Sequence, residues 1–484
     1  MTMRRSSLAL IGSLAVALPA IAIGACDGDG TNAVPLPLEA GTPTDAAPAE
    51  TALDAAPALD AALPPIASNG CRGVPVEPGH HYVTPGMCAN VVAAGLGAIR
   101  QLTFAPNGDL FGVTTVGVIK RFHDADGDGF YDLGEVTTYA DTGSNGNNCH
   151  IDGANGYLYA GGPNGVKRFP WSPTATSGGA GEDVVTGQPP GGHSKRAVHV
   201  WDGFLYVGSG STSNVSNDGA QADAYDDRRS MIRRFDLSTF TPGTPFAWLS
   251  GEIVTQGLRN PNGFTRNAAG KMFAVVNGMD DVLYQGNNVH NDNPGEQVVE
   301  IAMGKQYGYP FCFTAQRVPS GDQVIVPGTQ LALQGGPHDD AWCLANSSPP
   351  ATFIQAHSAP LDITFFDTQP KGGLPERFRG GAFVALHGSW DRVPATGYKV
   401  IWIPFDADGK ATMPSSTTST TTFPYETVFG GGDARGAVDG PWSWTNVSYS
   451  DQPRFVGAVV SSVDGSLYVT TDSGGYIYRI GLPN

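Results

Sequence analysis

Two polar segments at the ends of one predicted hairpin carry residue types that suit a ligand site. The first, 257–263, contains Arg259-Asn260, and the second, 276–281, reads Val-Asn-Gly-Met-Asp-Asp. The residues between them form two apolar runs separated by Ala269-Gly270, which predicts strand, turn and strand. Both polar segments therefore lie at the same end of the hairpin. Since arginine binds carboxylates with a planar fork and calcium prefers oxygen, we predict a calcium ion beside an anionic ligand. A polar cluster that only closes the hairpin is the alternative.

A second candidate metal site is the acidic segment 124–135. Its acidic residues fall at positions 1, 3, 5, 9 and 12 of an EF-hand loop, with Gly129 at position 6 and a backbone carbonyl available at position 7. The flanking residues 118–122 and 136–139 have the pattern of strands, so we predict a stabilising calcium loop inserted into a hairpin. A solvated acidic turn is the alternative. The predicted ligands are Asp124, Asp126, Asp128, Phe130, Asp132 and Glu135.

A histidine and three arginines stand just before predicted hairpins or, for Arg100, at the start of one. His193 lies in the run Gly-Gly-His-Ser-Lys-Arg, and a neutral imidazole at that place suits a general base. Arg100, Arg259 and Arg454 occupy matching places before other hairpins. Taken singly, each is also explained as an ordinary loop residue or a salt-bridge partner. Brought together at one level of a channel, they predict an anion-binding mouth.

The hairpins that position these residues recur six times, each followed by a third strand with alternating residues. The 65 glycines and 37 prolines also favour short strands and turns over helices. A unit of this kind cannot bury its own face, and radial packing of such sheets makes a β-propeller. We therefore predict an all-β fold, a six-bladed β-propeller of four-stranded antiparallel blades, in preference to a stacked sandwich. The hairpins are 100–115, 150–160, 197–209, 263–277, 361–387 and 456–471, and the third strands are 117–122, 165–169, 231–236, 297–301, 397–405 and 475–480.

Several motifs across residues 95–482 resemble the glucose/sorbosone dehydrogenases, a family of six-bladed propeller quinoproteins that use pyrroloquinoline quinone (PQQ). The most specific of them are the Arg-Asn-Pro and His-Gly-Ser-Trp motifs. The matching segments are Gly257–Pro261, Lys305–Cys312, His357–Pro360, His387–Arg392 and Gly397–Val400.

The resemblance implies roles for particular residues. The loop histidine of the family, its catalytic base, matches His193. The implied PQQ contacts are Arg259, Asn260 and Arg454, with Arg100 added because of its equivalent position. Carbonyls of Gly278 and Met279 are implied to hold an active-site calcium, and Asn277, which lies beside them, is expected to contact the cofactor.

Two features depart from the glucose enzymes. Their histidine is oriented by an acidic partner, and the segment 208–214 offers no carboxylate in that place. Their quinone-contacting lysine also has no clean match, and His387 or Arg392 is predicted to substitute for it.

The activity that the resemblance implies is dehydrogenation of a sugar or another alcohol or hemiacetal. Hydride passes to the quinone, calcium acts as a Lewis acid, and an external electron acceptor reoxidises the cofactor. Two other functions stay open. One is a non-catalytic propeller that binds a glycan or a protein partner. The other is a calcium-dependent lactone hydrolase, for which Asn277 with Asp280 or Asp281 would supply the metal ligands.

The amino terminus has the features of an exported lipoprotein. Residues 1–26 combine Arg4 and Arg5, a short apolar run and the cleavage box Ile-Gly-Ala-Cys, which predicts a signal peptide and lipidation of Cys26. Residues 27–70 are rich in Ala, Pro and Asp and are predicted to be a disordered tether. Residues 71–484 form the propeller domain. We therefore expect a periplasmic or cell-surface protein anchored to a bacterial membrane by its lipid.

The net charge argues against one class of partner, and the cysteine positions predict the disulfides. The net charge of −17, with no basic stripe to balance it, argues against nucleic acid as a partner. In an oxidising compartment the nearby cysteines are expected to pair. We predict the disulfides Cys71–Cys88 and Cys312–Cys343 and leave Cys149 unpaired.

Overall fold

The computed structural model describes residues 70–76, 81–146, 148–214, 228–320, 323–416, 420–431, 454–472 and 475–483. The predicted signal peptide and all of the predicted tether except Gly70 lie outside these residues. Over the described ranges, no helix has the length and the apolar character needed to cross a bilayer.

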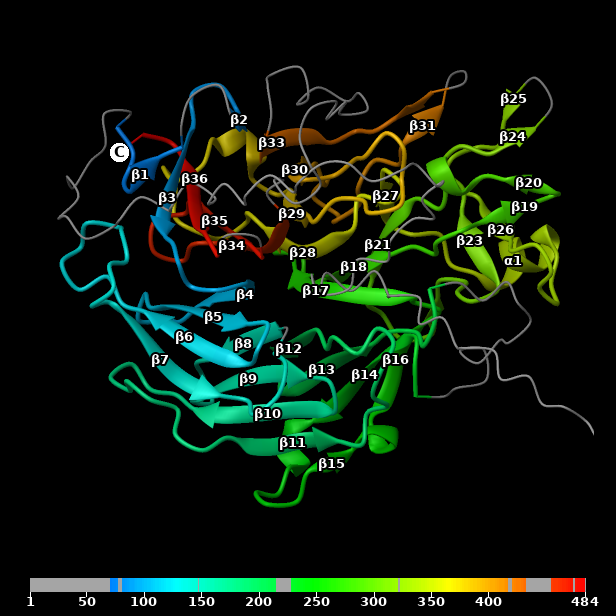
Figure 1. Cartoon of the computed structure of the whole chain (residues 1–484). Coiled ribbons are helices and arrows are strands. Elements are labelled where there is room, and N and C mark those ends of the chain that lie inside the picture. Colours follow the sequence, from blue (N-terminus) through cyan, green and yellow to red (C-terminus); the bar gives the residue numbers. More distant parts are fainter. Residues whose placement is uncertain are drawn as a thin grey trace, which may run out of the picture.

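Six mainly antiparallel sheets follow one another along the chain and are arranged around a common centre (Figure 1). Their inner strands contact one another in a closed ring, in the order β4, β8, β12, β17, β28, β34 and back to β4. The first three blades contain β4 (Ile99–Phe104), β5 (Leu110–Thr114), β6 (Val118–Phe122) and β7 (Val136–Asp141); β8 (Asn148–Asp152), β9 (Tyr157–Gly162), β10 (Gly165–Pro170), β11 (Glu182–Thr186) and β15 (Phe246–Ala247); and β12 (Val198–Trp201), β13 (Phe204–Ser209), β14 (Met231–Asp236), β16 (Glu252–Gln256) and β22 (Lys305–Gln306).

The last three blades follow the same plan. They contain β17 (Asn260–Arg266), β18 (Met272–Asn277), β21 (Glu296–Glu300) and β27 (Thr352–Ile354); β28 (Pro360–Phe365), β29 (Ala382–Leu386), β30 (Lys399–Ile403), β33 (Glu426–Gly431) and β2 (His81–Val83); and β34 (Phe455–Val460), β35 (Leu467–Thr471), β36 (Ile477–Gly481), β3 (Cys88–Ala93) and β1 (Val74–Pro75). The six-bladed propeller and the strands predicted for each repeat are thereby confirmed.

Two details differ from a uniform set of four-stranded blades. Four of the sheets have a fifth strand, and the fifth strands β15 and β22 pair in parallel with β11 and β16. An outer edge strand leaves a row of N–H and C=O groups unpaired, so short passing segments add to it. The amino-terminal strand β3 completes the last blade through its antiparallel pairing with β36, which closes the ring.

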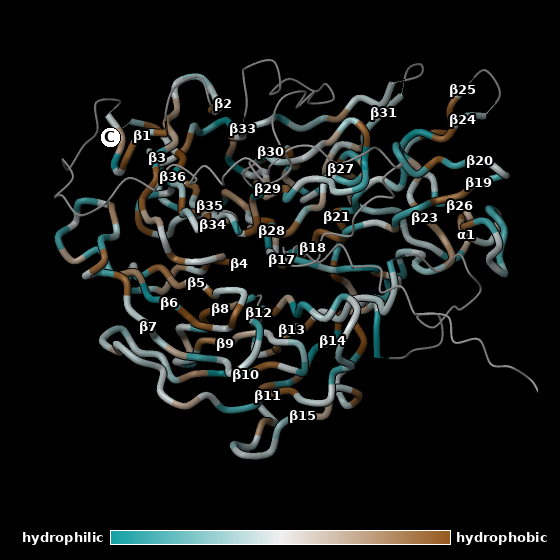
Figure 2. Tube along the Cα trace, in the orientation of Figure 1, coloured by the Kyte–Doolittle hydropathy of each residue, from teal (hydrophilic) through white to brown (hydrophobic). Residues whose placement is uncertain are grey.

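The core lies within and between the blades. Along the strands the hydrophobic residues recur between hydrophilic ones, as Figure 2 shows. In β6, for example, Ile119 is buried while its neighbours Val118 and Lys120 are partly exposed. Ile119 packs with Phe111 of the same blade and with Leu158 and Phe169 of the next blade. Burial of such interlocking faces stabilises the contact between consecutive blades, at roughly 25 cal/mol per Å² of apolar surface.

The connection after β18 and the one that leads into β27 form an additional lobe beside the fourth blade (Figure 1). Its helix α1 (Asp340–Asn346) begins after Asp339, whose side chain accepts a hydrogen bond from Trp342 N. The predicted disulfides Cys312–Cys343 and Cys71–Cys88 are both present, and Cys149 is free and buried. The other elements of the lobe are β19 (Leu283–Tyr284), β20 (Asn287–Asn288), η3 (His290–Asp292), β23 (Cys312–Thr314), β24 (Pro319–Ser320), β25 (Gln323–Val324) and β26 (Gln330–Ala332).

The remaining short elements lie in connections between strands of the blades. They are η1 (Leu237–Thr239), η2 (Trp248–Ser250), η4 (Glu376–Phe378), β31 (Ser415–Ser416) and β32 (Thr421–Thr422).

Candidate active site

The starts of the inner strands meet in the channel and place polar side chains there. One cavity is lined by residues of, or directly before, all six inner strands. Its cations are Arg100, Lys195 and Arg196, from the first and third blades. The other lining residues are Gln101, Asn148, Ala197, Asn262, Gly263, Leu361 and Val456. Of the residues predicted to converge in the channel, Arg100 lines this cavity. Lys195, which was not predicted, lines it too.

A second cavity lies at the end of the β17–β18 hairpin, where Asn260 and Asn277 are paired in register. Both polar segments predicted to share one hairpin end do so. The cavity is lined by Arg259, Asn277, Gly278, Asp280, Glu296, His357, Ala359, Gly388, Ser389, Trp390 and Asp391. Among the described residues of this lining are three carboxylic acids and one arginine, an arrangement that favours a bound cation.

Arg259 is held firmly in this cavity. Its guanidinium donates to the backbone and side-chain oxygens of Asn214 at 3.1 and 3.0 Å, and to Asp280 Oδ2 at 3.0 Å. Burial raises the pKa of Asp280, and the Arg259 charge opposes that rise. The ion pair therefore orients Arg259 and neutralises one of the three carboxylic acids.

Glu296, the first residue of β21, supports the loop that was predicted to bind calcium. Its carboxylate accepts hydrogen bonds from Gly278 N at 2.6 Å and from Ala359 N at 3.1 Å. Burial raises the pKa of Glu296 to about 7. Sequence reasoning selected Gly278 and Met279 but missed Glu296. The available signal was a glutamate at the start of a strand that contains the apolar pair Val298 and Val299.

Asp472 was also missed, and it organises a second charged group in the channel. Its Oδ2 accepts from Arg100 Nη1 at 3.2 Å and lies 2.9 Å from His387 Nε2. Burial opposes its ionisation, yet His387, Arg100 and Arg454 together lower the pKa of Asp472 to about 2. Three of the predicted cofactor-binding residues are thereby brought around one carboxylate. The missed signal was its place directly after β35, which matches that of Gly278 after β18.

Arg392 is not part of either group. Its guanidinium donates to Asn291 O at 2.8 Å, to Pro394 O at 2.6 Å and to Asp292 Oδ1 at 3.1 Å. These bonds tie the loop after β29 to η3. Of the two residues predicted to take the place of a quinone-contacting lysine, His387 lies in the channel cluster and Arg392 lies outside it.

His193 is completely buried. Its Nδ1 lies 2.8 Å from Ser211 Oγ, whereas Nε2 is buried and has no hydrogen-bond partner among the described residues. Burial lowers the pKa of His193 well below its ordinary value, and the nearby charge of Arg259 lowers it further. The imidazole is therefore neutral at physiological pH, and one ring nitrogen makes no hydrogen bond to the described residues. His193 is not among the residues that line either cavity. Asn260 Oδ1 is likewise buried, and the described residues provide no partner for it.

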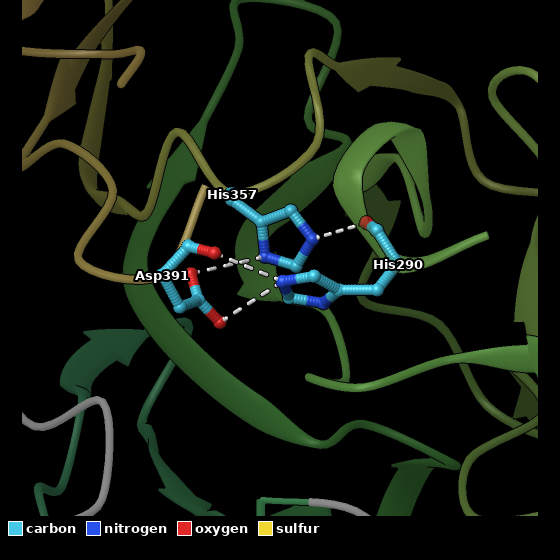
Figure 3. A group of neighbouring side chains, drawn as sticks. All are labelled: His290, His357 and Asp391. Carbon is cyan, nitrogen blue, oxygen red and sulfur yellow. Dashed lines mark hydrogen bonds and ion pairs between the residues drawn. The ribbon is translucent and has the colours of Figure 1, made fainter. Parts of the chain in front are cut away.

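Three further side chains at the edge of the second cavity face one another (Figure 3). His357 Nδ1 lies 3.6 Å from Asp391 Oδ1, and His290 Nε2 lies 3.6 Å from Asp391 Oδ2. Asp281 N donates to His290 Nδ1 at 3.0 Å, so the proton of neutral His290 is on Nε2, 3.1 Å from Asp391 O. Burial raises the pKa of Asp391 and lowers that of His357 to about 4. This group ties the loop after β29, which contains Asp391, to η3.

The acidic loop predicted to bind calcium connects β6 and β7. Gly129 has a φ of +78°, which provides the sharp turn needed at position 6. Oxygens of Asp124, Asp126 and Asp128 lie within 4.8 Å of one another, and Asp124 Oδ1 is buried without a partner in the described chain. The Glu135 carboxylate accepts from backbone N–H groups of the same loop. The donor set therefore fits a calcium ion.

A family profile described as TrAA12-like matches residues 81–482. The chain belongs to the TrAA12-like family. The family resemblance that the sequence motifs predicted is thereby confirmed.

Among known proteins, the chain is similar to a pyrroloquinoline quinone-dependent pyranose dehydrogenase of Coprinopsis cinerea, with 28% identity over 358 residues, 70% of this chain and 47% of that protein. The chain thus matches about half the length of that relative. It is also 28% identical over 355 residues to a pyrroloquinoline quinone-dependent sugar dehydrogenase of Hypocrea jecorina, covering 68% of this chain and 76% of that one.

Solved structures of this family share the fold. The holo form of the pyranose dehydrogenase PQQ domain from Coprinopsis cinerea matches with a TM-score of 0.71 and 24% identity, over 85% of this chain and 99% of that one. The calcium structure of a Trichoderma reesei family AA12 enzyme matches with a TM-score of 0.70 and 24% identity, over 86% and 99% of the two chains.

Proposed function

We propose that the propeller is a PQQ- and calcium-dependent dehydrogenase that oxidises a sugar or a related alcohol or hemiacetal. The observation that carries this proposal is the buried His193 Nε2, which the described residues leave without a partner. It lies beside Arg259, and Arg259 lines the carboxylate-rich cavity. The dependence of the named relatives on PQQ and on sugars supports the same proposal.

The residues present fit both groups. Arg100 and Lys195 of the first cavity, Arg259 of the second cavity and Arg454 near Asp472 are the cations that would bind the three carboxylates of PQQ, with Asn260 Oδ1 as an acceptor. The carbonyls of Gly278 and Met279 would hold calcium, and Asn277, Asp280 and Glu296 would supply further oxygen atoms and negative charge near it. When bound, the quinone supplies a hydride acceptor and calcium supplies a Lewis acid.

The residues of this chain perform the other steps. His193 Nε2 takes the proton of the substrate hydroxyl, since its lone pair is free and its ring is neutral. Arg259, fixed by Asp280 and Asn214, orients the anionic ligand beside it. Complete burial of the imidazole keeps bulk water away from the base.

Reconstitution of the purified full chain with PQQ and calcium tests this function. A panel of sugars and alcohols is then assayed by reduction of an artificial dye, with His193→Asn as the control variant. We expect reduction with at least one sugar in the parent and a large loss in the variant. Normal binding of PQQ and calcium without any dye reduction would overturn the proposal in favour of a propeller that only binds a glycan or a protein partner.

The loop between β6 and β7 is proposed to be a separate, stabilising calcium site. Its support is the full series of oxygen donors at EF-hand spacing and the partnerless, buried Asp124 Oδ1 in the described chain. Nothing in the loop is chemically reactive, and its donors belong to the first blade.

Export and anchoring are proposed from the sequence of residues 1–26, with Cys26 as the lipidated residue. Metabolic labelling with a fatty acid in a bacterial host is expected to mark the parent and to leave Cys26→Ser unlabelled. Label in both proteins would contradict lipidation at this cysteine. The electron acceptor is proposed to be an external carrier.

A further inference from the structure

The loop that follows β13 reaches His193 through one serine. Ser211 is completely buried, and its backbone is fixed on two sides. Its N–H donates to Arg259 O at 2.7 Å, and its carbonyl accepts from His193 N at 2.9 Å. The Ser211 hydroxyl is thus held between the two segments that carry the proposed base and the proposed anion-binding arginine.

The hydrogen bonds of this hydroxyl determine which ring nitrogen of His193 carries a proton. Ser211 Oγ lies 2.7 Å from the carbonyl oxygen of Ser213, which can only accept. The single hydroxyl proton is therefore donated to Ser213, because two oxygens at that distance repel each other without a proton between them. Toward His193 Nδ1, at 2.8 Å, Ser211 Oγ can then act only as an acceptor.

Neutral His193 must consequently carry its proton on Nδ1 and a lone pair on Nε2. Nε2 is the nitrogen that is buried and that the described residues leave without a partner. The hydrogen bonds therefore select the tautomer that a general base requires.

We propose that Ser211 is a positioning residue that orients His193 and holds it in the basic tautomer, through a relay from His193 Nδ1 to Ser211 Oγ to the Ser213 carbonyl. This inference rests on the proposed role of His193 as the base. The relay takes the role of the acidic residue that orients the histidine in the glucose enzymes and that residues 208–214 lack.

The surrounding charges give a reason for a neutral relay. The groups that act on His193 from neighbouring elements are the cations Arg259 and Arg229 and the Asn214 side chain, and Arg196 donates to the His193 carbonyl at 3.2 Å. A carboxylate at position 211 would attract Arg259, which is paired with Asp280. A hydroxyl fixes the tautomer without adding a charge that competes for this arginine.

A neutral relay also predicts the pH dependence of the base. The described residues offer His193 no anionic partner, so they give the imidazolium no ion pair, and the cations that face His193 disfavour it. The rate of the proton-abstraction step should therefore stay high at mildly acidic pH. An introduced carboxylate should stabilise the imidazolium and shift the acid limb of the rate profile to higher pH.

Three variants at one position test the relay. Ser211→Ala removes the acceptor, Ser211→Thr keeps a hydroxyl, and Ser211→Asp introduces a charge. The first readout uses the full chain without PQQ and needs no turnover. The nitrogen chemical shifts of ¹⁵N-labelled histidine report which ring nitrogen is protonated, and His193→Asn identifies the signal of His193. The second readout is stopped-flow reduction of PQQ in the loaded protein, measured from acidic to alkaline pH.

We expect His193 in the parent and in Ser211→Thr to be protonated on Nδ1, and Ser211→Ala to show a mixture of tautomers. The loss of one neutral hydrogen bond predicts a reduction rate about five- to tenfold lower in Ser211→Ala, with recovery in Ser211→Thr. Ser211→Asp should move the acid limb to higher pH.

Two results would overturn the inference. One is a parent His193 that carries its proton on Nε2. The other is a Ser211→Ala protein with the parental tautomer and the parental rate. Either result is independent of whether His193 is the base, because loss of reduction in His193→Asn tests that role separately. If His193→Asn keeps the parental rate while the tautomer depends on Ser211, the base assignment fails and the relay remains.

Discussion

Asp362 allows a direct test of how burial changes the pKa of a carboxylic acid between the inner strands of this propeller. It lies in β28 and joins three inner strands at the closing side of the ring. Its Oδ1 accepts from Gln101 Nε2 at 3.1 Å and from Ile363 N at 3.0 Å, and its Oδ2 accepts from Ala458 N at 2.9 Å. Burial nevertheless raises the pKa of Asp362 to about 7. The perturbation that we consider is Asp362→Asn.

The sign of the effect follows from proton linkage. Because the folded-state pKa lies above the unfolded value, the folded protein binds the Asp362 proton more tightly. The resulting stabilisation is complete below the unfolded pKa of about 3.9 and is lost as the pH rises through about 7. An asparagine has no proton to release in this range, so its contribution does not change.

The size of the effect follows from the same two values. A rise from about 3.9 to about 7 corresponds to about 4 kcal/mol in the free energy of unfolding, at about 1.4 kcal/mol per tenfold change in proton affinity. At acidic pH, Asp362→Asn should be less stable than the parent by about 1 kcal/mol or somewhat more, since its amide cannot accept the Ala458 N–H on the Nδ2 side. At neutral pH the difference should shrink or reverse.

Urea unfolding of both proteins without added PQQ, measured at intervals from pH 4 to pH 8, checks this expectation. The quantity of interest is the difference in the free energy of unfolding between variant and parent, because the other titrating groups cancel in it. We expect this difference to change by up to about 4 kcal/mol in favour of the variant as the pH rises. A difference that stays constant over the whole range would refute the reasoning that burial controls this carboxylic acid.

Three further predictions concern the ligand sites. Arg454→Ala and Arg259→Ala should each weaken PQQ binding, measured by fluorescence quenching, by roughly tenfold or more. Arg259→Ala should also lower the melting temperature, because it leaves Asp280 buried without its ion-pair partner; unchanged affinity in both variants would rule out these contacts. Asp124→Ala combined with Glu135→Ala should lower the melting temperature in calcium and leave PQQ affinity unchanged, and a melting temperature insensitive to chelation and to these mutations would contradict the calcium loop. His193→Asn should bind PQQ and calcium normally while PQQ reduction by substrate slows by about 10²–10⁴; reduction at the parental rate would show that His193 is not the base.

The fold was predictable because its signals are local. A hairpin and a third strand repeat six times, and each has its own turn residues and alternation, as β4–β6 and β34–β36 illustrate. The turn at Gly129 between β6 and β7 was predictable for the same reason, since the residues that indicate it lie within one short segment. The two disulfides followed from cysteines that are neighbours in sequence.

The charged partners of the site depended on tertiary structure. Asp472 meets Arg100 and His387 across three blades, and no spacing in the sequence relates them. Glu296 reaches Gly278 from the next strand of its blade, and its raised pKa follows from burial. A carboxylate in the sequence is only a potential charge, and desolvation together with neighbouring charges decides whether it ionises.

The proposed base shows most clearly what the sequence determines and what only the tertiary structure decides. The sequence alone identified His193 as the candidate base and showed that no carboxylate follows in residues 208–214. Only the folded chain brings Ser211 to 2.8 Å from the ring and turns its hydroxyl toward the Ser213 carbonyl. A tautomer is set by the direction of individual hydrogen bonds, and that direction exists only once the backbone has placed donors and acceptors within reach of one another.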